Sequence, residues 1–119
     1  WLAEGGYELV AKRIFKGIRA QRLLLEYDDA RSGSFEPLTE VLPDKIAVLG
    51  LVSTKRPRLE TKEELVARIM EASRFLPLEQ LALSPQCGFA SSIVANRLSW
   101  EDEKQKLRVI VETAKAVWG

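Results

Sequence analysis

The residues of this sequence that are best suited to chemistry stand just after short apolar runs. Glu26 follows three leucines, Ser53, Thr54 and Lys55 follow the apolar residues 46–52, and Cys87 comes shortly after residues 81–83. If these runs are parallel β-strands, their carboxyl ends meet on the face where β/α proteins keep their active sites. A soft sulfur and a hard carboxylate from two strand ends suit a mixed zinc site.

Cys87 and Glu26 each have a structural interpretation beside the chemical one. Pro85 stiffens the approach to Cys87 and Gly88 allows a sharp turn behind it, which suits a presented thiol. A lone cysteine is also commonly a small buried apolar residue. Glu26 is desolvated at a strand end unless it meets a cation, so it is a metal ligand, a general base or the ion-pair partner of Arg31.

The cluster at the end of residues 46–52 is a weaker candidate. The Ser53 hydroxyl and the Lys55 ammonium could bind the carboxylate or phosphate of a substrate. They could equally begin a polar loop that continues into the basic residues 55–58. A phosphate site ranks last, because no glycine-rich loop accompanies these residues.

The elements that would position these residues alternate along the chain. Helical periodicity indicates a helix over about residues 2–18, and apolar runs indicate strands over 23–25, 46–52 and 81–83. Residues 36–42 are compatible with a short helix, and the run 23–25 is typical of a strand buried on both faces. Alternating elements of this kind imply parallel strands with right-handed crossovers.

Two further helices carry capping-box signatures. Thr61 is followed three residues later by Glu64, and Ser99 by Asp102. The buried stripe of the first is expected at Leu65, Ile69, Ala72 and Phe75. That of the second is expected at Leu107, Ile110, Val111, Ala114 and Trp118.

Length and composition narrow the function classes. The 119 residues allow at most one domain, and a net charge of +1 favours neither nucleic acid nor a membrane surface as a partner. One cysteine excludes an internal disulfide and fits a reducing compartment, so we expect a cytoplasmic protein. The sequence has no histidine. A zinc site of the usual His/Cys type therefore cannot be completed from this chain alone.

A (β/α)8 barrel needs eight strands and about 250 residues, so we expect residues 1–119 to be the C-terminal part of one.

Five stretches of the sequence together form a distinctive set. They are WLAEGGYE (1–8), LEYDDARSG (25–33), LGLVSTK (49–55), LALSPQCGFA (81–90) and VETA (111–114). The chain resembles the C-terminal part of the catalytic barrel of the cobalamin-independent methionine synthase family, and in particular its short methionine-synthase-like members. The resemblance covers essentially the whole chain.

This resemblance implies a (β/α)8 barrel that binds zinc at the carboxyl ends of its strands. The implied ligands are a His and a Cys of an His-x-Cys motif, a Glu that Glu26 matches, and a second Cys that Cys87 matches. The motif would lie before Trp1. The implied reaction moves a methyl group from a folate-type donor to a zinc-bound thiol, homocysteine, giving methionine.

Two alternatives to this function stay open. Relatives of the superfamily use the same zinc–thiol chemistry on other thiols, as in alkylation of coenzyme M by an epoxide. A barrel fragment without activity could instead self-associate through its open sheet edges. We expect the isolated chain to be inactive, because two of the four implied ligands are absent from it.

Overall fold

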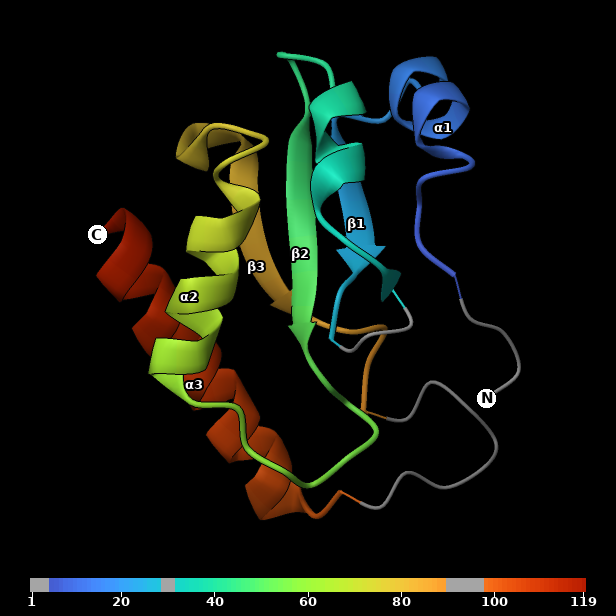
Figure 1. Ribbon diagram of the computed structural model, residues 1–119. Coiled ribbons are helices and arrows are strands. Elements are labelled where there is room, and N and C mark those ends of the chain that lie inside the picture. The colour runs from blue at the N-terminus through green and yellow to red at the C-terminus, as the bar shows by residue number, and fades with distance from the viewer. Residues whose placement is uncertain (1–4, 29–31, 90–97) are drawn as a thin grey trace.

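The chain folds into a three-stranded parallel sheet flanked by helices (Figure 1). The computed structural model describes residues 5–28, 32–89 and 98–119. Its sheet has the order β1-β2-β3. The elements are α1 (Ala11–Gly17), β1 (Arg22–Glu26), the 3-10 helix η2 (Glu36–Glu40), β2 (Ile46–Val52), α2 (Lys62–Ala72), the 3-10 helix η3 (Leu78–Gln80), β3 (Leu81–Pro85) and α3 (Trp100–Trp118).

The register of the strands brings their carboxyl ends together. Glu26 pairs with Gly50, and Gly50 pairs with Ser84 across the sheet. An irregularity between Gly50 and Val52 then shifts the partner of Pro85 to Val52. The three predicted strands and their parallel direction are confirmed.

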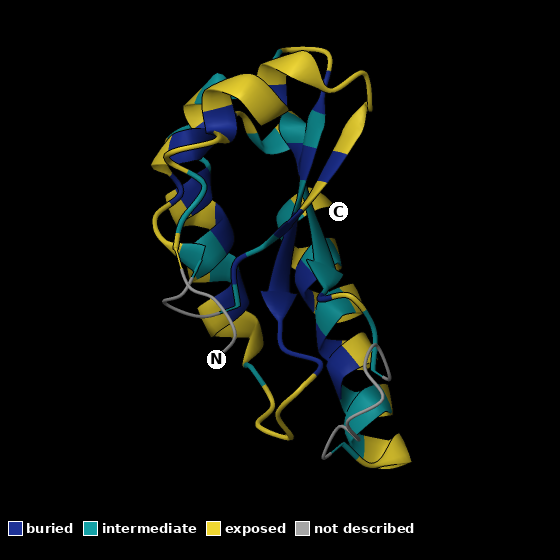
Figure 2. Cartoon of the chain, turned by 90° about the vertical axis from the view of Figure 1, so that its right-hand side faces the viewer, coloured by how far each residue is buried: buried dark blue, intermediate teal, exposed yellow. Residues whose placement is uncertain are grey.

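Helices cover one face of the sheet. Leu25 of β1 and Leu49 of β2 belong to the core, which also contains Phe15, Ile69 and Val109 from the three α-helices. Figure 2 shows buried residues in dark blue, and β2 is buried along its carboxyl half.

The described helices leave the opposite face of the sheet uncovered. Leu24, between the buried Leu23 and Leu25, is 74% exposed. The expectation that this strand is buried on both faces is therefore wrong. Side chains alternate across a strand, and the described helices pack against only one of the two faces.

Both predicted capping boxes are confirmed. The Thr61 side chain accepts from the Glu64 N–H at 3.1 Å, and the Glu64 carboxylate accepts from the Thr61 N–H at 3.0 Å. Ser99 and Asp102 form the same reciprocal pair at the start of α3. Each box satisfies N–H groups that the first turn of a helix leaves without partners.

Helix α3 buries a different face from the one predicted. Leu107 and Val111 are 44% and 51% exposed, whereas Lys106, Val109 and Thr113 are buried. Ile110 packs against the core only in part. A buried lysine, paired with a glutamate of another segment, stands where a sequence pattern would place a solvent-exposed charge.

The first helix is shorter than predicted. It spans Ala11–Gly17, residues 5–10 precede it without regular helix, and residues 1–4 lie outside the described part. The possible helix over 36–42 is a 3-10 helix over Glu36–Glu40. Among the described residues, no helix is long and apolar enough to cross a membrane.

Candidate functional site

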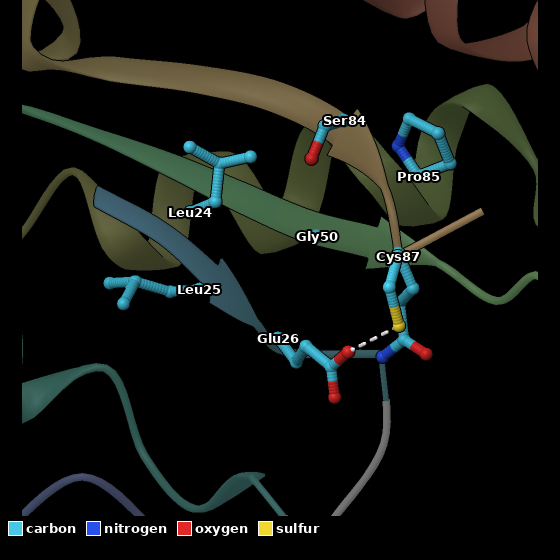
Figure 3. Close-up of a pocket in the computed structure, with 8 residues that line it drawn as sticks. Leu24, Leu25, Glu26, Gly50, Ser84, Pro85 and Cys87 are labelled. Carbon is cyan, nitrogen blue, oxygen red and sulfur yellow. Dashed lines mark hydrogen bonds between the residues drawn. The ribbon is translucent and has the colours of Figure 1, made fainter. Parts of the chain in front are cut away.

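Glu26 and Cys87 meet at the carboxyl ends of β1 and β3. The Cys87 thiol donates to the Glu26 carboxylate, with Sγ and Oε1 3.1 Å apart (Figure 3). Cys87 is exposed, which excludes its interpretation as a small buried residue, and Glu26 is partly exposed. Arg31, the alternative partner of Glu26, lies outside the described residues.

The backbone around the pair is fixed by β2. The N–H of Gln86 donates to Val52 O at 3.0 Å, and the N–H of Tyr27 donates to Gly50 O at 3.0 Å. These bonds extend the pairing of both outer strands one residue beyond their ends. They anchor the residue before Cys87 and the residue after Glu26 to the same central strand.

Two glycines permit this geometry. Gly88 has φ +120°, in the region that favours glycine, so the chain turns directly behind Cys87. A Cβ at Gly50 would stand 3.0 Å from Leu25 O and 3.6 Å from Glu26 Cα. The absence of a side chain at Gly50 therefore lets the end of β1 approach β2 closely.

A hollow of about 160 Å³ lies beside the pair. Its apolar wall includes Leu24 and Pro85, and its polar groups come from Ser84, Gln86 and the pair itself. The Gln86 side chain is buried, and neither atom of its carboxamide has a hydrogen-bond partner in the described structure. Buried amides without partners are costly, so this one is a group that a ligand could satisfy.

Tyr7 supports Glu26 from the segment before α1. Its hydroxyl accepts from the Glu26 N–H at 2.9 Å. Burial raises the pKa of the Tyr7 phenol above its ordinary value, and the negative charge of Glu26 raises it further, against the lowering effect of the backbone bond. Tyr7 is therefore a neutral hydroxyl at physiological pH.

The donor set at the pair suits zinc chemically. Thiolate and carboxylate are two of the ligand types that Zn²⁺ takes in proteins, and the strand ends hold them in contact. Within the described ranges, no third Cys, Asp or Glu joins them to form a metal-binding cluster. The chain can therefore contribute two ligands at this point, fewer than the four of a tetrahedral site.

Ser53 and Lys55 stand apart from the lining of this hollow. Ser53 is buried, its N–H donates to Glu60 Oε1 at 3.1 Å, and its hydroxyl accepts from the Lys55 N–H at 3.3 Å. Lys55 itself is exposed. The local bonds match the interpretation of these residues as the start of a polar loop.

A buried ion pair holds that loop in place, and the sequence gives little sign of it. Lys106 of α3 donates to Glu60 Oε2 at 3.0 Å and to Arg58 O at 2.6 Å. The side chain of Lys106 is 1% exposed. Sequence reasoning also missed Tyr7 as a support for Glu26, although its place in the stretch 1–8 was a signal.

Comparisons with known proteins agree on one family. Residues 15–116 match the family described as the cobalamin-independent synthase, catalytic domain. The uncharacterised protein YxjG of Bacillus subtilis is 52% identical over 119 residues, which are 99% of this chain and 32% of that protein. The 5-methyltetrahydropteroyltriglutamate–homocysteine methyltransferase of Saccharomyces cerevisiae is 26% identical over 100 residues, covering 84% of this chain and 12% of that enzyme.

A solved structure has a similar fold. A protein of Listeria monocytogenes, assigned as a vitamin-B12 independent methionine synthase, aligns with a TM-score of 0.72 and 34% identity. The alignment covers 98% of this chain and 33% of that one. The chain thus spans about a third of the length of the curated Bacillus relatives it matches.

Proposed function

This chain belongs to the cobalamin-independent synthase catalytic-domain family, a family of methyltransferases, and we propose that it supplies two of the four protein ligands of a zinc site for thiol methylation. The predicted resemblance and the predicted α/β fold, part of a methionine synthase barrel, are confirmed. The observation that carries the proposal is the 3.1 Å contact between Cys87 Sγ and Glu26 Oε1.

Each residue of the pair has a distinct proposed role. Cys87 supplies a thiolate and Glu26 a carboxylate, and together they bring two negative charges to the metal. Bound Zn²⁺ would keep a substrate thiol deprotonated at neutral pH. The two ligand charges keep the site electron-rich, so that a thiolate held there remains nucleophilic.

The proposed reaction transfers a methyl group from a folate-type donor to homocysteine. The Saccharomyces relative carries both substrates in its name. The hollow of about 160 Å³ is below the 300–1,000 Å³ of pockets for drug-sized ligands, so it suits the small thiol better than the methyl donor. Ser84 and Gln86 line it and are the polar groups in its wall besides the pair. Ser53 and Lys55 would reach only a ligand that extends beyond it.

The chain alone is expected to lack this activity, since the His-x-Cys ligands are not in its sequence. Alkylation of a different thiol, such as coenzyme M, is the alternative within the same chemistry. Assaying a longer protein that contains this chain against several thiols distinguishes the two. Conversion of homocysteine by the isolated chain with added Zn²⁺ would overturn the expectation of inactivity.

Cobalt(II) binding tests the proposed ligands directly. Co²⁺ replaces zinc and gives an absorption band when a thiolate coordinates it. We expect the band in the wild-type chain, its loss in Cys87→Ser, and weaker Co²⁺ binding in Glu26→Gln. Glu63→Gln, an exposed glutamate of α2, is the matched control. Equal binding by Glu26→Gln and Glu63→Gln would refute the role of Glu26.

Self-association is a second candidate property, favoured by the open face of the sheet. Leu24 is 74% exposed, and β1 and β3 form the two edges of the described sheet. Unpaired edges and exposed leucines favour pairing with another copy. Light scattering at micromolar concentration should show an oligomer that Leu24→Glu dissociates. A stable wild-type monomer would rule this property out.

A further inference from the structure

Tyr7 reaches across to the end of β1 from nineteen positions earlier in the chain. Its carbonyl accepts from the N–H groups of Val10 and Ala11, at 3.0 and 2.7 Å, where α1 begins. Its hydroxyl accepts from the Glu26 N–H at 2.9 Å. Because β1 is an edge strand of the described sheet, this N–H is satisfied by a side chain instead of a neighbouring strand.

A cluster of aromatic rings fixes the direction of the Tyr7 hydroxyl. The Tyr7 ring lies 5.7 Å from Phe15 of α1 and 5.4 Å from Tyr27, which directly follows Glu26. Tyr27 in turn lies 4.6 Å from Phe35. The rings of Phe15, Tyr27 and Phe35 are all buried. Ring centroids at these separations pack favourably, and two-angle side chains lose little freedom, so the cluster holds Tyr7 in one orientation.

Arg68 packs against the aromatic cluster at Phe35. The Arg68 guanidinium of α2 stands 4.3 Å over the Phe35 ring, and its Nη2 donates to Tyr27 O at 3.3 Å. The segment before α1, the end of β1 and α2 are thereby joined around the residue pair Glu26–Tyr27. Glu26 points its carboxylate at Cys87, and the side chain of Tyr27 is buried in the core.

We infer that Tyr7 is a positioning residue, whose hydroxyl holds the backbone of Glu26 so that the carboxylate stays in contact with Cys87. The inference deepens the proposed function, because it concerns the same pair of ligands. Groups that orient metal ligands from outside the site change metal affinity by about 10- to 100-fold when removed. The bond acts on the main chain of Glu26, so we expect the lower end of that range.

The chain contains a matched control for this residue. Tyr7→Phe removes a hydroxyl bonded to Glu26, whereas Tyr27→Phe removes a buried hydroxyl that has no hydrogen-bond partner among the described residues. Both substitutions keep the ring and its packing. A purely structural contribution of the aromatic cluster would move both variants alike.

Two measurements on each variant test the inference. Amide hydrogen exchange by NMR reports the Glu26 N–H in the metal-free chain, and the Cys87 resonances report its contact with the carboxylate. Calorimetry measures the Zn²⁺ affinity, which reports how well Glu26 and Cys87 are placed to bind the metal together. For Tyr7→Phe we expect exchange at Glu26 to speed up about tenfold, shifted Cys87 resonances, and zinc affinity reduced about tenfold. Tyr27→Phe should not speed up exchange at Glu26 and should keep the Cys87 resonances and the zinc affinity of the wild type.

The outcomes separate the inference from the proposed function. Equal zinc affinity of the wild type and Cys87→Ser contradicts the proposed function, while hydrogen exchange and the Cys87 resonances still decide the role of Tyr7. Unchanged Glu26 exchange and Cys87 resonances in Tyr7→Phe overturn the inference even if zinc binds. So do equal changes in Tyr7→Phe and Tyr27→Phe.

Discussion

Replacing Lys106 with methionine should destabilise the chain by about 3 kcal/mol, because it leaves the largely buried carboxylate of Glu60 without its cation. Lys106 is 1% exposed at its side chain, and its partner Glu60 is 13% exposed. The ammonium bonds Glu60 at 3.0 Å and Arg58 O at 2.6 Å. This pair ties α3 to the loop that follows β2 and carries Ser53.

The magnitude follows from what remains after the substitution. Removing one partner of a buried ion pair costs about 3–5 kcal/mol. Glu60 keeps the Ser53 N–H at 3.1 Å and retains some contact with solvent, so the lower end applies. The methionine chain fills much of the space of the lysine stem. The loss is a large fraction of the roughly 5–15 kcal/mol that stabilises a domain.

Urea unfolding followed by tryptophan fluorescence measures the effect. With a slope of about 2 kcal/mol/M, a loss of 3 kcal/mol lowers the midpoint by roughly 1.5 M. Lys115→Met, at an exposed position of the same helix, is the matched control and should change the stability by less than about 0.5 kcal/mol.

A double-mutant cycle gives the test that would refute this reasoning. Glu60→Gln keeps an acceptor for Ser53 but removes the charge. The double variant with Lys106→Met should then be more stable than the sum of the two single losses predicts, by at least about 1 kcal/mol. Additive losses, or a loss below 1 kcal/mol in Lys106→Met, would show that the pair is not a desolvated ion pair.

Three further predictions follow from individual contacts. Gly50→Ala places a Cβ 3.0 Å from Leu25 O, so urea unfolding should show a loss of about 1–3 kcal/mol and calorimetry weaker zinc binding; unchanged values would contradict the close approach. Tyr27→Phe removes a buried hydroxyl that has no hydrogen-bond partner in the described structure. It should raise the urea midpoint, with a gain of about 1 kcal/mol in the free energy of unfolding. A loss of stability would instead show that the Tyr27 hydroxyl makes a stabilising hydrogen bond. The bonds from the Thr61 and Ser99 N–H groups lower the pKa values of Glu64 and Asp102 below 4.5 and 3.8. Their stabilisation is therefore complete above those values and is lost as the pH falls through the lowered pKa values, and the acid unfolding curve of Glu64→Gln with Asp102→Asn should be flatter than that of the wild type.

Local signals made much of the fold predictable from sequence. The strand over residues 46–52 is uniformly apolar and branched, and the boxes at Thr61 and Ser99 depend only on residues three positions apart. Parallel direction followed from alternation of strands and helices. It also implied that Glu26 and Cys87 lie at the same edge of the sheet, and the structure places them in contact.

The failures of the sequence analysis share a physical cause, because they depend on partners far away in the chain. The face that α3 buries is set by Lys106, whose partner Glu60 lies 46 positions earlier and whose aliphatic stem is invisible to an apolar-periodicity count. Leu24 looks like a core residue in a run of three leucines, but the described helices cover only one face of the sheet. The support of Glu26 by Tyr7 likewise joins residues 19 positions apart, with the whole of α1 between them.

Zinc binding by the chain tests the central claim most directly. Equilibrium dialysis with metal analysis should find one Zn²⁺ per chain, bound through both Glu26 and Cys87. Glu26→Ala and Cys87→Ser should each weaken this binding at least tenfold, while Glu63→Ala should bind as the wild type does. Zinc bound equally well by all four proteins would contradict the claim that these two side chains form half of a metal site.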